Sequence, residues 1–224
     1  MLPIGPKPLI EHILDALREA GIQRFGIVIG YLGDLIEQHF ARYPVPISWF
    51  YQTELNGTAR ALGLTRDFVG SDPFLLTFGD IWCEAKDYGS LMGALTENDS
   101  TEAVIGVRWV EDPWAGAAVY VDNEGYVTGV IEKPAKGTSG TNWNSAGLYA
   151  FCKSVMNELE HVPISPRGEY EIASAINQLI DRGRKLRYYS ISGRWHDVGR
   201  PEDLRALSAE LGYTFDLGGT IQEL

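Results

Sequence analysis

Short apolar segments alternate with helical patterns through the first third of the chain, and this alternation limits the available folds more than any other feature. Apolar side chains recur at helical spacing from Leu9 to Leu17, with Gly21 as a natural stop, and residues 25–29 have the length of a buried strand. Further helical patterns and strand-like runs follow at residues 32–40, 47–51, 58–68 and 73–78. Such alternation is typical of βαβ units, so we expect an α/β fold with a mainly parallel sheet.

The pattern changes after about residue 101, where strand-like runs dominate. We expect strands at residues 103–110, 117–121, 126–131, 144–151 and 186–191, and helices at 171–180 and 201–211. Asp122-Asn123-Glu124-Gly125 has the composition of a hairpin turn between two of these strands. No linker, repeat or low-complexity tract interrupts the chain, so we interpret residues 1–224 as a single domain.

Charge and cysteine usage argue against several classes of protein. The chain has 30 acidic and 19 basic residues, a formal net charge of -11, whereas a broad nucleic-acid surface needs excess positive charge. No apolar run approaches the roughly 20 residues of a membrane helix, and the N-terminus lacks the features of a signal peptide. Cys83 and Cys152 belong to no paired motif, which fits buried thiols in a reducing compartment, so we expect a cytoplasmic protein.

Candidate ligand-binding residues lie in loops at strand ends, where open α/β sheets bind ligands. The sequence contains no Walker loop, GxGxxG motif, nucleophile elbow or HExxH motif. The loop from Gln52 to Thr58 passes from a strand end into a helix start, and Gly57 and Thr58 would expose backbone N–H groups that can bind a base or a phosphate. The alternative is a purely structural helix start with Thr58 as its N-cap.

Three further strand ends carry charged side chains. Asp80 follows an apolar strand and is a candidate metal ligand, or else a helix cap or turn former. The adjacent Glu132 and Lys133 can contact a hydroxyl and a phosphate together, or form an exposed ion pair. Asp197 lies on a loop before a helix, where it is either a second acidic ligand or a cap. Each of these patterns is weak by itself.

In this order, however, the segments resemble those of one family, the sugar-1-phosphate nucleotidyltransferases. Residues 1–12 are similar to the family's LPVxGKPLIEH stretch, residues 52–62 to its QxxxLGTAxAL loop, and residues 74–80 to PFLVxxGD. The remaining matches are Glu132-Lys133-Pro134 to EKP, residues 168–172 to GEYEIT, and residues 195–204 to WxDxGxPEDL. The resemblance extends from residue 1 to about 206 and leans towards the thymidylyl- and uridylyltransferases that act on glucose 1-phosphate.

The resemblance implies a Rossmann-like nucleotidyltransferase fold, with a mostly parallel mixed sheet and helices on both faces. It also implies a reaction in which a phosphate oxygen of a sugar 1-phosphate attacks the α-phosphorus of a nucleoside triphosphate and releases pyrophosphate. Such chemistry depends on positioning and electrostatics and needs no covalent nucleophile. The expected substrates are dTTP or UTP and glucose 1-phosphate, the expected cofactor is Mg²⁺, and the expected assembly is a homo-oligomer.

The same resemblance gives each candidate residue a role. Asp80 and Asp197 would bind Mg²⁺, and with Lys133, which would neutralise the sugar phosphate, they form the expected catalytic set. The residues expected at the nucleotide are Gln52, Gly57, Thr58 and Asp80. The residues expected at the sugar are Ala117, Glu132, Asn144, Ser145 and Gly147.

Several positions depart from the family pattern. Gly116-Ala117 stands where the family often has Tyr-Gly, Ser145 stands where it often has Asn, and Leu55-Asn56-Gly57 has one residue more than the family's Leu-Gly. These differences leave the base and the sugar open. The family's GxGTRL loop and the strand before it, which would be the central strand beside residues 25–29, do not occur in the sequence.

Three explanations for this departure are open: a start assigned to an internal Met of a longer protein, an inactive fragment, or a non-catalytic relative that binds a nucleotide sugar or a partner subunit. For the chain as given, we expect weak binding of nucleoside triphosphate and little catalysis. The joint presence of Asp80, Lys133 and Asp197 favours an enzyme over a binding or regulatory subunit. A glycosyltransferase with a related sheet is disfavoured because the sequence has no DxD motif.

Overall fold

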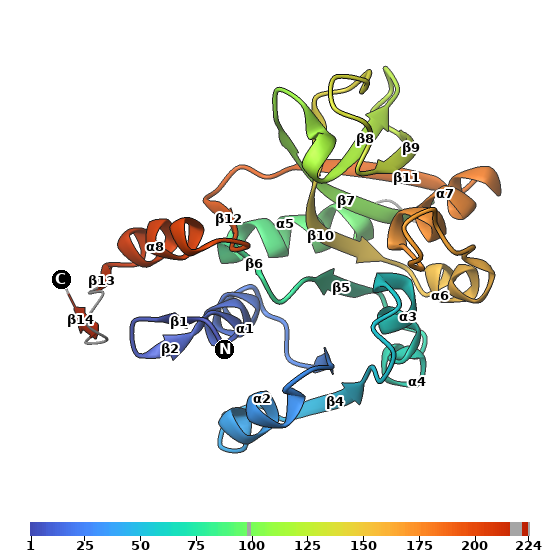
Figure 1. The fold of residues 1–224 in the computed structure, drawn as a ribbon. Coiled ribbons are helices and arrows are strands. Elements are labelled where there is room, and N and C mark those ends of the chain that lie inside the picture. Colours follow the sequence, from blue (N-terminus) through green and yellow to red (C-terminus); the bar gives the residue numbers. More distant parts are fainter. Residues whose placement is uncertain (98–99, 216–220, 224) are drawn as a thin grey trace.

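The computed structural model describes residues 1–97, 100–215 and 221–223 (Figure 1). The first half contains β1 (Pro3–Ile4), β2 (Lys7–Pro8), α1 (Leu9–Glu19), β3 (Phe25–Ile29), α2 (Gly33–Phe40), β4 (Ile47–Tyr51), α3 (Thr58–Gly63), α4 (Arg66–Val69), β5 (Phe74–Thr77), β6 (Ile81–Cys83) and α5 (Ala85–Thr96). The second half contains β7 (Thr101–Trp109), β8 (Ala117–Val121), β9 (Val127–Glu132), β10 (Trp143–Phe151), α6 (Ser154–Glu158), α7 (Ile172–Asp181), β11 (Lys185–Ser190), β12 (Trp195–Asp197), α8 (Pro201–Glu210), β13 (Tyr213–Phe215) and β14 (Ile221–Glu223). Two short 3₁₀ turns, Pro113–Ala115 and Leu159–His161, complete the elements.

A six-stranded mixed sheet forms the centre of the molecule. Its strand order is β11-β7-β10-β8-β9. The sixth strand, β5, pairs with the C-terminal part of β10, from Leu148 to Phe151. β10 is antiparallel to β5, β7 and β8, whereas β7 and β11 are parallel. β5, β7 and β11 therefore run in one direction and β10 runs against them. The expected α/β fold with a mixed sheet is confirmed.

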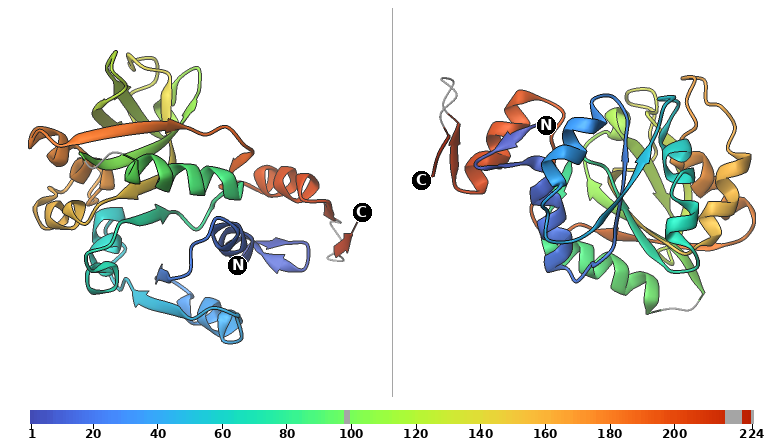
Figure 2. Two further views of the ribbon diagram at one scale, coloured as in Figure 1. Left: turned by 180° about the vertical axis from the view of Figure 1, so that it is seen from behind. Right: turned by 90° about the horizontal axis from the view of Figure 1, so that it is seen from below.

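Helices cover both faces of this sheet (Figure 2). On β7, Ala103, Ile105 and Val107 face one hydrophobic cluster, which includes α7, whereas Val104 faces a second cluster, which includes α1, α5 and α8. This division follows from the alternation of side chains along a strand. α5 packs on β7 and β10, and α7 packs on β9 and β11. No helix in the described ranges is long and apolar enough to cross a membrane.

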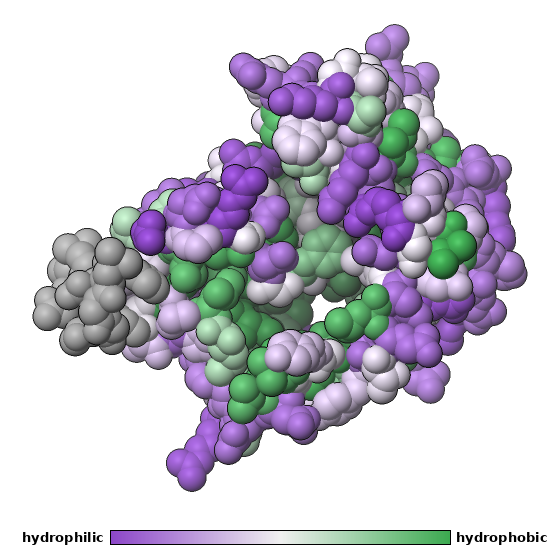
Figure 3. All heavy atoms as spheres, viewed as in Figure 1, coloured by the Kyte–Doolittle hydropathy of each residue, from purple (hydrophilic) through white to green (hydrophobic). Residues whose placement is uncertain are grey.

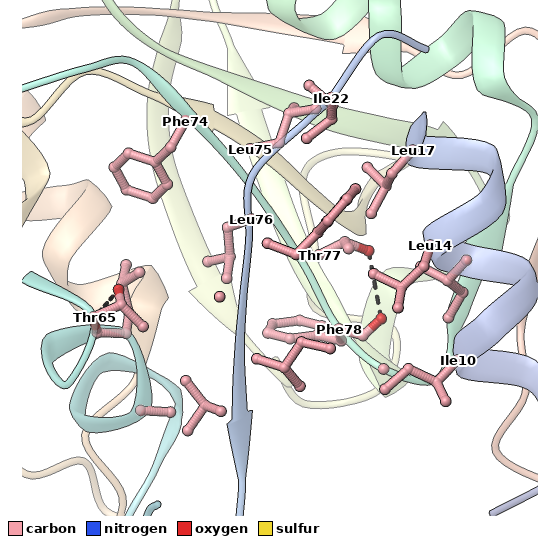
Figure 4. Close-up of a pocket in the computed structure, with 18 of the residues that line it drawn as sticks. Ile10, Leu14, Leu17, Ile22, Thr65, Phe74, Leu75, Leu76, Thr77 and Phe78 are labelled. Carbon is pink, nitrogen blue, oxygen red and sulfur yellow. Dashed lines mark hydrogen bonds between the residues drawn. The ribbon is translucent and has the colours of Figure 1, made fainter. Parts of the chain in front are cut away.

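β3 and β4 form a separate, parallel two-stranded sheet. A cavity of about 850 Å³ lies between this pair and β5, and its walls come from β3, β5, α1, α3 and α4. Apolar side chains such as Leu14, Leu17, Phe74 and Leu76 surround it (Figure 4), and Figure 3 shows hydrophobic residues bordering a hollow in the surface. The N-terminal half is therefore less densely filled than the half built on the six-stranded sheet.

The expected helix at 58–68 is two short helices, and the prediction of one continuous helix was wrong. α3 ends at Gly63 and α4 begins at Arg66. Between them, the N–H and the hydroxyl of Thr65 both donate to the carbonyl oxygen of Leu62, at 3.0 and 2.8 Å. A threonine hydroxyl can compete in this way with the regular helix bonds, and Gly63 has low helix propensity, so the helix ends here.

Candidate active site

The structure brings Asp80 and Asp197 together although they are far apart in sequence. β12 pairs with β6 in antiparallel register, with Asp197 opposite Ile81. The pairing continues for one more residue, because the N–H of Val198 donates to the carbonyl oxygen of Asp80 at 2.9 Å. Asp80 lies between β5 and β6, and Asp197 is the last residue of β12, so this short pairing brings the two residues together. Figure 1 shows β12 beside β6.

The electrostatic environment of Asp197 is unfavourable for a lone carboxylate. Burial raises the pKa of Asp197 above its ordinary value, and the nearby carboxylates of Asp80 and Asp203 raise it further. Carboxylate oxygens are ligands that Mg²⁺ prefers, and Mg²⁺ commonly takes one or two of them while keeping water and phosphate oxygens. The described residues contain no group of three or more acidic, histidine or cysteine side chains that could hold a metal. Asp80 and Asp197 supply two carboxylates, a number that Mg²⁺ commonly takes from a protein.

The loop after β4 is held in shape by Gln52. Its side-chain amide Nε2 donates to the carbonyl oxygen of Gly57 at 3.1 Å and to Oδ1 of Asn56 at 3.3 Å. Gly57 has φ +119°, and a Cβ there would collide with the backbone of Tyr170. Only glycine combines this dihedral angle with so close an approach, so the loop conformation depends on Gly57.

Thr58 does not cap α3, and that structural alternative was wrong. Gly57 is the N-cap residue, without a side-chain capping bond, and the hydroxyl oxygen of Thr58 instead accepts the N–H of Ile172 at 3.0 Å. Two main-chain bonds reinforce this link: the N–H of Tyr170 donates to Asn56 at 2.8 Å, and the N–H of Ala59 donates to Tyr170 at 2.8 Å. The loop that follows β4 is thereby tied to the start of α7.

Glu132 and Lys133 lie at the end of β9. Glu132 pairs across the strands with Ala117, and the N–H of Lys133 donates to the carbonyl oxygen of Gly116 at 2.7 Å. Lys133 has φ +42°, one of two positive values among the non-glycine residues of the described part of the chain. A left-handed lysine is uncommon, and it turns the chain sharply where the strand ends. Glu132 is therefore the last residue of the strand, and Lys133 occupies the bend that follows it.

Glu132 belongs to a cluster of acids around one arginine. Nη1 of Arg167 lies 3.3 Å from Glu132 and 3.4 Å from Glu171, and its Nη2 lies 3.5 Å from Glu169. Burial raises the pKa of Glu132, and Glu171 adds to the rise, whereas Arg167 and Lys133 oppose it. We call these four residues, Glu132, Arg167, Glu169 and Glu171, the arginine cluster.

The residues expected at the sugar lie on two faces of the sheet. The hydroxyl groups of Ser145 and Tyr149 form a hydrogen bond of 2.8 Å. Both side chains lie on the face of the sheet that also carries Glu132 and Ala117. Asn144 pairs with Arg108 of β7 and points to the other side, where it lines a pocket of about 320 Å³ together with Asp197. The structure thus brings Ala117, Glu132 and Ser145 together and places Asn144 beside the acidic pair.

Gly147 lies at the irregularity of β10, between the pairs made by Ser145 and Tyr149. Its φ is +71°, and a Cβ would lie 2.9 Å from Ile81 and 3.1 Å from Phe78. The glycine lets β10 approach the segment that carries Asp80. Its N–H donates to Oγ of Ser145 at 3.3 Å, so Gly147 connects the Ser145 side of β10 to the segment that carries Asp80.

Three side chains that the sequence interpretation did not assign belong to this region. Arg167 pairs with the acid expected at the sugar, Tyr149 bonds Ser145, and Arg108 donates to the carbonyl oxygen of Trp195 at 3.2 Å. Arg167 directly precedes the segment 168–172, so the match of that segment to GEYEIT was the available signal. Arg108 and Tyr149 are strand residues within ordinary alternating patterns, and no local signal distinguished them.

A mixed α/β sheet with two acids brought together beyond its strands is an architecture of proteins that bind nucleotides at a sheet edge. The nucleotidyl transferase family matches residues 1–213, and the chain belongs to this family.

Two archaeal relatives and one solved structure show how far the similarity extends. The low-salt glycan biosynthesis nucleotidyltransferase Agl11 of Haloferax volcanii is 33% identical, over 91% of this chain and 57% of its own length. The UTP–glucose-1-phosphate uridylyltransferase AglF of the same organism is 34% identical, over 91% of this chain and 83% of its own. A candidate glucose-1-phosphate thymidylyltransferase of Bacillus anthracis, solved with sucrose, has a TM-score of 0.79 at 27% identity, covering 93% and 84% of the two chains. The chain thus spans little more than half the length of Agl11.

Proposed function

We propose that this chain transfers a nucleoside monophosphate from a nucleoside triphosphate to a sugar 1-phosphate, releasing pyrophosphate and forming a nucleotide sugar. The observation that carries the proposal is the pairing of β6 with β12, which brings Asp80 and Asp197 to one place. Membership of the nucleotidyl transferase family supports it. The names of AglF and of the Bacillus anthracis structure favour UTP or dTTP and glucose 1-phosphate as substrates.

The acidic pair would serve the phosphate groups. Asp197 is held near Asp80 and Asp203, so a bound cation would relieve the repulsion among these carboxylates. Bound there, Mg²⁺ supplies positive charge against the triphosphate and the departing pyrophosphate. A phosphate oxygen of the sugar 1-phosphate forms the new bond to the α-phosphorus, and the bond from the α-phosphorus to the bridging oxygen of pyrophosphate breaks.

The remaining residues would bind and orient the two substrates. The bend at Lys133 presents a cation for the sugar phosphate, and the adjacent Glu132 presents an acceptor for sugar hydroxyls. Gln52 and Gly57 hold the loop after β4, which would receive the base. Ala117 and Ser145 border the same face as Glu132 and would limit the shape of the sugar that fits.

Pyrophosphate release measures this function directly. The purified chain is incubated with Mg²⁺ and each combination of UTP, dTTP, ATP or GTP with glucose 1-phosphate, N-acetylglucosamine 1-phosphate or galactose 1-phosphate. We expect release to be slow, in line with the little catalysis expected for this chain, but to be fastest with UTP or dTTP and glucose 1-phosphate, and to need both substrates. Absence of release from every pair, in both the forward reaction and pyrophosphorolysis of the nucleotide sugar, contradicts the proposal and favours a non-catalytic binding role.

A further inference from the structure

Asp87 is a fully buried carboxylate outside the set of residues considered so far. It is the third residue of α5 and has 0% exposure. Its Oδ1 accepts the hydroxyl of Tyr189 at 3.1 Å, the N–H of Ser192 at 3.0 Å and the hydroxyl of Ser192 at 3.2 Å. Its Oδ2 accepts the N–H of Gly193 at 3.0 Å. Both oxygens are therefore used, and every donor comes from one short stretch of chain.

That stretch carries the chain from the main sheet to β12. Tyr189 lies at the end of β11, and Ser192 and Gly193 form the connection that leaves the sheet. A Cβ on Gly193 would lie 2.5 Å from Oδ2 of Asp87 and 2.5 Å from Oε2 of Glu84, so a larger residue would force the connection or these carboxylates to shift. Asp87 thus holds the connection against the start of α5.

A second acid holds the next residue of the connection. Nε of Arg194 donates to Oε1 of Glu84 at 2.7 Å, and the N–H of Glu84 donates to the carbonyl oxygen of Arg194 at 3.3 Å. Glu84 and Asp87 both follow β6 directly, so the partner strand of β12 and the anchor of its connection belong to one rigid segment.

β12 depends on this anchor because it is short. It has three residues, from Trp195 to Asp197, and within the described part of the chain its strand partner is β6. Two other hydrogen bonds hold only its first residue, Trp195. Arg108 donates to the carbonyl oxygen of Trp195, and the indole of Trp195 donates to the carbonyl oxygen of Ala146 at 2.9 Å. A shift of the connection at Ser192 and Gly193 would be transmitted along β12 to Asp197.

We propose that Asp87 is a positioning residue that fixes Asp197 next to Asp80 and thereby sets the affinity of the acidic pair for a divalent cation. The inference rests on the metal site of the proposed function. A carboxylate is needed because four donors converge on both of its oxygens. An asparagine has one carbonyl oxygen, and its NH₂ group would face a donor, so one side of the anchor would be lost.

Mn²⁺ binding, followed by the EPR signal of the free ion, tests the inference without turnover. Asp87→Asn should bind Mn²⁺ about 10-fold more weakly than the wild type, as is common when a group that orients metal ligands is changed. Glu158→Gln is the matched control, because Glu158 is also a buried carboxylate, with 3% exposure, and it pairs with Arg182 far from β12. Wild-type affinity in Asp87→Asn overturns the inference.

A second variant covers the case in which Asp87→Asn does not fold, as judged by circular dichroism. Gly193→Ala keeps the carboxylate but pushes the connection away from it, and the same loss of Mn²⁺ affinity is expected. Hydrogen exchange of residues 191–197 should increase in both variants, whereas a purely global loss of stability would raise exchange everywhere.

The outcomes separate this inference from the proposed function. A wild type that binds Mn²⁺ but releases no pyrophosphate refutes the proposed reaction and leaves the role of Asp87 standing. A wild type that does not bind Mn²⁺ refutes the metal site and the role of Asp87 together. A wild type that releases pyrophosphate while Asp87→Asn keeps its Mn²⁺ affinity refutes the inference alone.

Discussion

Two acidic regions of the molecule differ in how their charge is balanced. In the arginine cluster, Arg167 lies within 3.5 Å of Glu132, Glu169 and Glu171. At the acidic pair, the charged neighbours that shift the pKa of Asp197 are themselves acids, Asp80 and Asp203. The protein therefore supplies a counter-ion to one group of carboxylates, whereas at Asp197 the repulsion from neighbouring acids remains.

The difference assigns separate tasks to the two regions. A cluster organised around one guanidinium can hold its geometry in the free protein and present Glu132 to a polar ligand with little reorganisation. A pair of acids that repel each other gains most when a cation binds. Predictions that change one region and not the other test this division, beginning with the largest expected effect.

The largest effect is expected at the acidic pair. Asp80→Asn and Asp197→Asn should each lower the rate of pyrophosphate release by about 10²–10³-fold, because each removes a charge that would hold the cation against the phosphates. Steady-state assays over a range of Mg²⁺ concentrations measure this. Asp181→Asn, at an exposed acid that ends α7, is the control and should keep the wild-type rate. A variant of the pair within twofold of the wild type removes that residue from the site.

A smaller, pH-dependent effect is expected at the arginine cluster. The pKa of Glu132 is raised above 4.5 in the folded protein, so the folded state holds this proton more tightly than the unfolded chain. This proton contributes its full stabilisation at a pH below the pKa of Glu132 in the unfolded chain. The stabilisation is lost as the pH rises through the higher pKa of Glu132 in the folded protein. The free energy of unfolding of Glu132→Gln, relative to the wild type, should therefore increase between pH 4 and pH 7, by less than about 1 kcal/mol because the group is partly exposed.

Urea denaturation of both proteins at several pH values provides this measurement. A relative stability of Glu132→Gln that decreases with rising pH would show that Arg167 outweighs burial and the neighbouring Glu171. The balance assigned to the cluster would then need revision.

The last prediction concerns the link between the arginine cluster and the loop after β4. Thr58→Val removes the acceptor of the Ile172 N–H, next to Glu171, and should lower the free energy of unfolding by about 1–2 kcal/mol. Thr96→Val, whose hydroxyl bonds its own helix, should stay within about 0.5 kcal/mol of the wild type. Equal effects of the two substitutions in urea denaturation would show that the link contributes little.

Much of the fold could be read from local patterns, because burial on a strand or helix leaves a period in the sequence. The strands at 25–29 and 47–51 lie where predicted, and the helix expected at 201–211 is α8, Pro201–Glu210. The split between α3 and α4 could not be read in the same way. It depends on a hydroxyl of Thr65 that bonds the backbone, and such a bond leaves no hydrophobic period.

The candidate site was predictable as a set of residues but not as an arrangement. The motifs located Asp80 and Asp197, yet their approach depends on the pairing of two three-residue strands, which are too short to show a pattern. The opposite directions of Asn144 and Ser145 follow from strand register, and a sequence shows two neighbours without showing which face each one meets. Arg167 was missed because the partner that matters for the site, Glu132, lies 35 positions away in another segment.

The link from Thr58 to Ile172 also has a consequence for the order in which the chain acquires its structure. The two residues are 114 positions apart, so the loop after β4 reaches its final shape only when the start of α7 is available. A chain made from its N-terminus at about 5–20 residues per second has the whole of β3, β4 and α3 synthesised several seconds before that partner emerges. The loop proposed to receive the base is thus translated well before the partner that completes it.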